Sequence, residues 1–152
     1  GDTAEQQENT IARILFFVEN HWNELLRFSR RTNRQMEKWA ARYGRKDDPK
    51  AILHSAKSSG NGRYTCVNLS NYDTIEFRMF RGTLKYNTLI ATLQIVDRIC
   101  DVAFFLSDEE IQNITWSEFV SNLREETTPE LIRYLKERRL YINDPVESSE
   151  EV

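Results

Sequence analysis

The chain has 152 residues, a length that suits a single domain. Apolar residues make up 39% and charged residues 30%, and three Trp, eight Phe and six Tyr need burial, which excludes a disordered chain. The net charge of −3 argues against nucleic acid as the main partner. No apolar run approaches the roughly 20 residues that cross a bilayer, so no membrane contact is expected.

The cysteines and histidines are few and scattered. Cys66 and Cys100 have no neighbours at metal-ligand spacing, and a chain of this size does not need a disulfide. His21 and His54 are isolated, so they do not indicate a zinc site. Two buried free thiols are typical of a reducing compartment, and we expect a cytoplasmic protein.

Helical periodicity dominates the chain on both sides of a central segment. Residues 9–31 predict a long amphipathic helix that resumes weakly to Tyr43, and Pro49 opens a short helix that ends near Lys57. After the centre come a helix over 86–106, one opened by a capping box from Thr115 to Glu118, and one that begins at Thr128-Pro129. The stripe expected on the 86–106 helix contains Leu89, Leu93, Val96, Ile99, Cys100 and Ala103.

The central segment predicts a β-hairpin. Residues 63–69 and 74–80 are strand-like, and the connector 70–73 has hairpin length. Alternation would separate Ile75, Phe77 and Met79 from Glu76, Arg78 and Phe80 on the second strand.

These elements predict a predominantly helical α+β fold. A single domain would span 1–145, and an acidic, disordered tail would span 146–152. A hairpin alone is marginally stable and leaves unpaired edges. We therefore expect the sheet to be completed by a missing N-terminal segment or by a second copy of the chain.

Glu76 and Arg78 are the first candidates for a functional site. Their side chains would leave the same face of a strand, where a carboxylate can bind Mg²⁺ and an arginine can clamp a phosphoryl group. A solvated ion pair on an open sheet explains the same spacing.

A second candidate is a basic run in the first helical region. Its spacing would align four cations along one face if the helix were continuous: Arg27, Arg31, Arg34 and Lys38. This face could attract a nucleotide or an acidic partner. It could equally be a solvated face whose aliphatic stems cover apolar neighbours.

The run 64–84, with Val67-Asn68-Leu69 followed by Thr74-Ile75-Glu76-Phe77-Arg78-Met79-Phe80-Arg81-Gly82-Thr83-Leu84, resembles the C-terminal signature of the amidoligase family. In that family, a "VNL" strand leads into T-(I/V)-E-F-R-x-F-R-G-T-L. Phe28-Ser29-Arg30-Arg31 is similar to the arginine-bearing helix end of the same proteins. The resemblance covers roughly residues 11–103.

The resemblance implies an ATP- and Mg²⁺-dependent ligase with a glutamine-synthetase-like fold, which joins a carboxylate to an amine or ammonia through an acyl phosphate. Glu76 would then be a metal ligand and Arg78 a phosphate-binding arginine. Arg30 or Arg31 would be a second phosphate or substrate contact, and Arg63 and Asn68 would be weaker candidates on the same sheet.

The sequence departs from the family in one respect. Related amidoligases carry Glu-x-Glu and Gly-x-His-x-His strands in an N-terminal portion, and neither pattern occurs here in a strand context. We therefore expect the C-terminal part of such an enzyme, or a degenerate stand-alone relative, with little or no activity alone. The alternative is a non-enzymatic helical module that uses the basic face to recruit an acidic partner.

Overall fold

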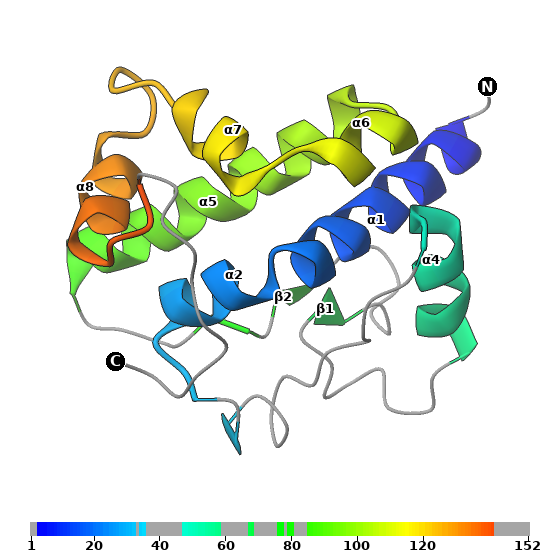
Figure 1. The fold of residues 1–152 in the computed structure, drawn as a ribbon, viewed down its shortest axis with the longest axis horizontal. Coiled ribbons are helices and arrows are strands. Elements are labelled where there is room, and N and C mark those ends of the chain that lie inside the picture. Colours follow the sequence, from blue (N-terminus) through cyan, green and yellow to red (C-terminus); the bar gives the residue numbers. More distant parts are fainter. Residues whose placement is uncertain are drawn as a thin grey trace.

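The chain is described by a computed structural model that covers residues 3–32, 34–35, 47–58, 67–68, 76–77, 79–80 and 85–141. Long helices dominate it, with α1 running diagonally and α5 lying beside it (Figure 1). The helices are α1 (Thr3–Asn20), α2 (Trp22–Ser29), α4 (Pro49–Ser58), α5 (Tyr86–Phe105), α6 (Asp108–Asn113), α7 (Trp116–Ser121) and α8 (Pro129–Glu137). The strands are β1 (Val67–Asn68) and β2 (Glu76–Phe77).

The first helical region is two helices rather than one. His21 leaves the helical conformation at φ −116° and ψ 35°, and a new helix, α2, starts at Trp22. The imidazole is buried against Phe17 and Trp116, at ring centroid distances of 4.5 and 5.9 Å. Packing of the His21 ring on aromatic neighbours therefore accompanies a break that the hydrophobic periodicity does not reveal.

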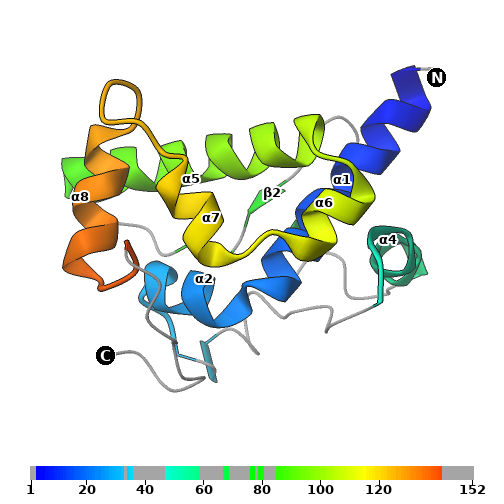
Figure 2. The same ribbon diagram turned by 45° about the horizontal axis from the view of Figure 1, so that its top comes forward.

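Helix α5 packs on two other long elements of the fold. It lies against α8 and α1, while α4 and α6 pack on α1 (Figure 2). Its buried residues are spaced four apart: Ala91, Ile95, Ile99 and Ala103. The predicted stripe was therefore only partly right, because Leu89 and Leu93 are 45% and 57% exposed.

The C-terminal helices begin where the sequence predicted. Thr115 and Glu118 form the expected capping box at the start of α7, with mutual backbone and side-chain hydrogen bonds. Ser107 and Glu110 form a second box on α6, whose hydrogen bonds lower the pKa of the Glu110 carboxyl. Pro129 occupies the first turn of α8, where its missing N–H needs no partner.

The predicted α+β class, with an antiparallel hairpin over 63–69 and 74–80, is wrong. The predominance of helix is confirmed, but the described residues contain no β-layer of that kind. The extended pairing among them joins only Val67–Asn68 to Glu76–Phe77. Residues 79–80 form a bend instead of continuing a strand.

The physical reason for this correction lies in the side chains after Phe77. Met79 is fully buried in the helical core, and the ring of Phe80 stacks on that of Phe77 at 6.4 Å with an interplanar angle of 18°. Strict alternation would have placed Phe77 and Phe80 on opposite faces. Burial of these side chains against the helices is therefore favoured over extension of the strand. The described residues contain no sheet like that of glutamine synthetase.

Several predictions fall outside the described residues. These are the helical pattern over 36–43, the outer parts of both predicted strands and the acidic tail over 146–152. No helix in the described part of the chain is long and apolar enough to span a membrane.

The complete burial of the α5 stripe predicts a large effect of truncating it. Ile95→Ala should lower the free energy of unfolding by about 2–5 kcal/mol, because Ile95 is fully buried and a cavity would remain. Denaturant unfolding would measure this. The exposed Gln112→Ala on α6 serves as the control and should change stability by less than about 0.5 kcal/mol. Equal effects of the two changes would contradict this packing.

Candidate functional site

An aromatic cluster joins three separate segments of the chain. The ring of Phe28, near the end of α2, meets Phe80 edge-on at 5.6 Å and Tyr134 of α8 at 4.7 Å. The Tyr134 hydroxyl also donates a hydrogen bond to the Phe28 carbonyl oxygen at 2.9 Å. These contacts hold the C-terminal end of α2 against α8 and against the segment that follows β2.

Arg30 terminates α2 in the left-handed conformation, at φ 63° and ψ 20°. Its backbone N–H donates to the Arg27 carbonyl at 3.3 Å, and the Ser29 hydroxyl donates to Leu26 O at 2.6 Å. The same hydroxyl oxygen accepts from the Arg31 N–H at 3.1 Å. The backbone direction of both predicted arginines is thus set by hydrogen bonds within the helix end.

A reciprocal pair of arginine–carbonyl contacts lies next to Arg30. Arg27 Nε donates to the Arg138 carbonyl at 2.8 Å, while Arg138 Nε and Nη2 donate to the Arg27 carbonyl at 3.2 and 2.8 Å. The Arg138 carbonyl at the end of α8 gains a side-chain donor in this way, and the Arg27 carbonyl accepts from the Arg138 guanidinium in addition to the Arg30 N–H. This pairing fixes Arg138 beside the end of α2.

A pocket of about 610 Å³ opens over this junction, and we call it the basic pocket. Three helices contribute to it, since it spans the end of α2, the start of α5 and the end of α8. Its lining consists of Arg30, Lys85, Tyr86, Asn87, Thr88, Tyr134, Glu137 and Arg138. The volume falls within the roughly 300–1,000 Å³ of common small-molecule sites.

The electrostatics of the basic pocket favour an anion. Its lining holds three cations, Arg30, Lys85 and Arg138, and the carboxylate of Glu137. The first turn of α5 has no acidic residue, and Lys85 provides no side-chain cap to it. The N–H groups of that turn and the positive end of the helix dipole therefore point toward an already basic lining.

The structure places the predicted site residues unevenly. Arg30 lines the basic pocket, and Arg31 follows it with its side chain half-buried. The backbones of Asn68 and Glu76 lie opposite each other in the β1–β2 register. The side chains of Asn68 and Glu76, and all of Arg63 and Arg78, lie outside the described residues, so their roles stay predictions.

Two lining residues were not predicted from the sequence. Lys85 directly follows Gly82-Thr83-Leu84, the end of the family-like signature. Its position next to the signature could have identified it as a candidate site residue. Arg138 had none, because only the packing of α8 on α2 brings it to the pocket.

The predicted basic face is interrupted. Arg27 lies on α2, but the left-handed Arg30 ends that helix. Thr32 then starts a new turn, since its hydroxyl accepts from the Gln35 N–H at 3.2 Å and its own N–H donates to Gln35 Oε1 at 3.0 Å. Arg27 and Arg34 therefore do not share one continuous helix, which removes the geometric basis for a single recruiting stripe.

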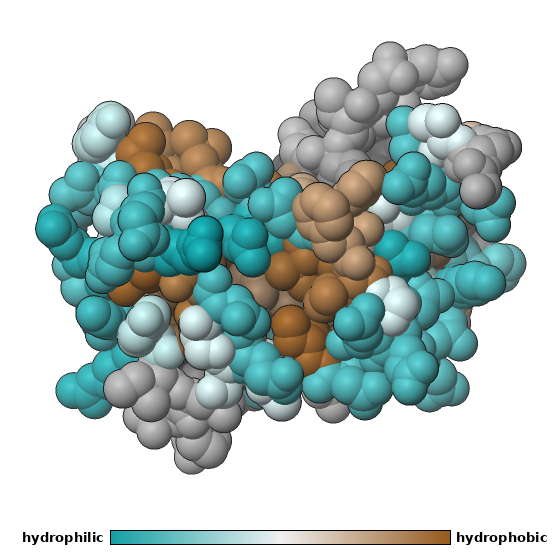
Figure 3. Space-filling model, turned by 90° about the horizontal axis from the view of Figure 1, so that it is seen from above, coloured by the Kyte–Doolittle hydropathy of each residue, from teal (hydrophilic) through white to brown (hydrophobic). Residues whose placement is uncertain are grey.

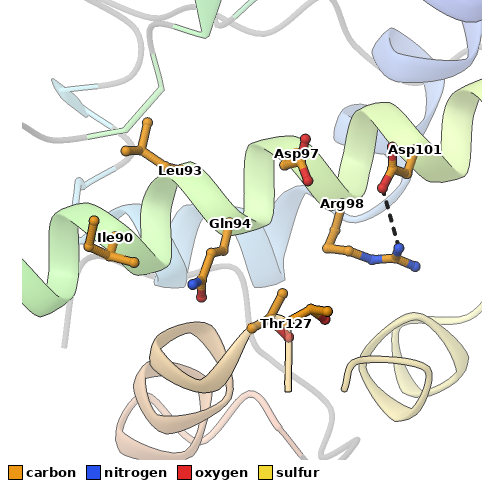
Figure 4. A pocket seen from close by; sticks show the side chains of 8 residues that line it. Ile90, Leu93, Gln94, Asp97, Arg98, Asp101 and Thr127 are labelled. Atoms are coloured by element: carbon orange, nitrogen blue, oxygen red, sulfur yellow. Dashed lines mark hydrogen bonds and ion pairs between the residues drawn. The ribbon is translucent and has the colours of Figure 1, made fainter. Parts of the chain in front are cut away.

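A second hollow, of about 530 Å³, lies farther along α5 and opens toward the loop before α8 (Figure 4). Gln94 points toward Thr127 and accepts from the Leu131 N–H at 2.9 Å, while Arg98 reaches Asp101 at 3.5 Å. None of the predicted site residues lines this hollow.

Comparisons with known proteins give no match to a family model, a curated protein or a solved structure. Within the described ranges, no group of three or more His, Cys, Asp or Glu side chains could hold a metal ion.

The left-handed conformation of Arg30 predicts that glycine is tolerated there. Arg30→Gly should change the free energy of unfolding by less than about 1 kcal/mol, since relief of a cost of about 1–2 kcal/mol offsets the entropy that glycine adds to the unfolded chain. Arg27→Ala, by contrast, should destabilise by about 1–3 kcal/mol because it leaves the Arg138 carbonyl without its donor. Thermal or urea unfolding distinguishes them, and the reverse order would show Arg30 to be the structural residue.

Proposed function

We propose that the chain is the C-terminal part of an amidoligase, an ATP-dependent enzyme that joins a carboxylate to an amine or ammonia. One observation carries the proposal. Arg30 belongs to the first part of the family-like sequence, and Lys85 directly follows the second part. Both residues line the basic pocket. A basic pocket is what the resemblance requires for binding a phosphoryl group.

The proposed reaction has two steps. An oxygen of the substrate carboxylate attacks the γ-phosphorus of ATP, the bond to the β,γ-bridging oxygen breaks, and ADP leaves. The amine nitrogen then attacks the acyl carbon of the acyl phosphate, inorganic phosphate leaves, and the nitrogen loses a proton. Negative charge spreads over the phosphoryl oxygens in the first step, so fixed cations around them are the main contribution of the protein.

The residues of the basic pocket fit phosphate better than they fit a metal. Arg30 contributes a planar guanidinium to this lining and Lys85 an ammonium group at the start of α5, and both are groups that commonly pair with phosphate. Glu137 is the one carboxylate in this lining. Mg²⁺, when bound, would neutralise phosphate charge. By the resemblance Glu76 would be its ligand and Arg78 would bind phosphate. Arg30 or Arg31 would be a second phosphate or substrate contact, and Arg63 and Asn68 would be weaker candidates.

We also propose a cytoplasmic location, where ATP is available. Cys100 supports it as a free thiol in the described part of the chain, and burial together with the carboxylates of Asp97 and Asp101 raises its pKa. Such a thiol resists oxidation and suits a reducing compartment.

Arg78→Ala in the natural protein that carries this sequence tests the catalytic assignment. We expect ADP release with Mg·ATP, hydroxylamine and a panel of carboxylic acids to fall about 10²–10³-fold, because a stabiliser of transition-state charge is lost. Thermal stability should change little, by about 0–1 kcal/mol. Preserved turnover with a marked loss of stability would instead assign Arg78 a structural role.

Arg30→Gly provides the matched test of the basic pocket in the same assay. It should raise the KM for ATP or lower kcat at least tenfold while leaving the fold intact, since glycine suits that backbone position. Unchanged kinetics in this variant would remove the basic pocket from the reaction.

A further inference from the structure

Aromatic side chains are exposed at both ends of α5. In the described part of the chain, the large hydrophobic residues with high exposed fractions all belong to this helix: Tyr86 (72%), Leu89 (45%), Leu93 (57%), Phe104 (47%) and Phe105 (76%). Brown hydrophobic patches interrupt the hydrophilic surface in the space-filling view (Figure 3). Exposed apolar residues are ordinary on a protein surface, so exposure alone does not indicate a ligand.

The exposed aromatic rings at the two ends of α5 differ in their surroundings. Phe104 and Phe105 meet each other edge-on, at a ring centroid distance of 5.0 Å. Within the described ranges, Tyr86 makes no such contact with another ring, and it is the one of these three residues that lines the basic pocket. A largely exposed aromatic ring therefore lies in the same pocket as the cations Arg30 and Lys85.

The packing of α5 on α8 positions Tyr86 at the basic pocket. Gln94, in the first half of α5, accepts from the N–H of Leu131 near the start of α8. The start of α5 and the end of α8 then meet in the lining of the basic pocket, to which they contribute Tyr86 and Glu137. The start of α5 lies beside α8 in both ribbon views (Figure 1, Figure 2). The place of the Tyr86 backbone is thus fixed by contacts between two helices, although its ring is exposed.

We propose, resting on the proposed function, that Tyr86 stacks on the base of the nucleotide whose phosphates bind in the basic pocket. The cations of this pocket attract any polyphosphate, so charge alone does not distinguish a nucleoside triphosphate from inorganic tripolyphosphate. An aromatic ring adds an attraction that only the nucleotide can use, because bases stack on aromatic side chains. Tyr86 is then the residue that selects a nucleotide over a bare polyphosphate.

The remaining lining suits a ligand that is both anionic and aromatic. Three cations against the single carboxylate of Glu137 leave two positive charges in the basic pocket, which is complementary to the dianion Mg·ATP. A carboxylate repels phosphate, but it can accept a hydrogen bond from the exocyclic amino group of adenine. The volume of about 610 Å³ is typical of sites for drug-sized ligands rather than for one small anion. A nucleotide therefore explains the ring and the carboxylate, which a bare polyphosphate does not.

Titration calorimetry of the full chain with Mg·ATP and with Mg·tripolyphosphate tests the stacking. Tyr86→Ala should weaken ATP binding about 5- to 100-fold, the usual loss for one stacked base, and leave tripolyphosphate binding unchanged. Tyr86→Phe should retain ATP binding because it keeps the ring. Phe105→Ala is the matched control, since it removes a ring of similar exposure (76%) from the other end of α5, and it should change the binding of neither ligand.

Arg30→Gly in the same titrations separates this inference from the proposed function. If both ligands bind and Arg30→Gly weakens both, the basic pocket binds phosphoryl groups. Base stacking alone would then be overturned by equal effects of Tyr86→Ala on the two ligands, by no effect on either, or by a Tyr86→Phe variant as weak as Tyr86→Ala. If neither ligand binds, or if binding is indifferent to Arg30→Gly, the phosphoryl site is overturned and base stacking with it.

Discussion

The contact between Phe28 and Tyr134 is the constraint on which the candidate site depends. The rings meet edge-on at 4.7 Å, and the Tyr134 hydroxyl donates to the Phe28 carbonyl in a buried position. Such an aromatic pair contributes about 0.5–1.5 kcal/mol beyond its buried area, and the hydrogen bond adds a similar amount. Because the contact joins residues far apart in the chain, it places the ends of α2 and α8 together, and with them Arg30 and Arg138.

An apolar frame under a charged lining explains how like charges come to lie together. Arg138 is held by its bonds to the Arg27 carbonyl, and the left-handed end of α2 sets the backbone of Arg30. The N-terminal turn of α5 adds backbone N–H groups from a third direction. Under the proposed function, positive groups gathered at this junction would stabilise the charge of a phosphoryl group.

Local patterns were predictable from the sequence, and long-range packing was not. The Thr115–Glu118 capping box and the start of α8 at Pro129 depend on neighbouring residues, and both are present. The predicted hairpin was too long. Alternation of apolar and polar residues over 74–80 is compatible with a strand, but it is equally compatible with a bend that buries Met79 in the helical core. Arg30 was identified through its motif, whereas Arg138 reaches the pocket only through tertiary contacts that no local pattern records.

Chemical-shift mapping of Mg·ATP on the ¹⁵N-labelled chain tests the central claim most directly, because it reports where phosphate binds independently of the unknown acid and amine. The account predicts that the largest amide shifts occur at Arg30 and over 85–88, and that Arg30→Gly weakens the binding at least tenfold. Shifts confined to the hollow near Asp97 and Asp101, or no shifts at millimolar Mg·ATP, would contradict the assignment of the basic pocket as a phosphoryl site.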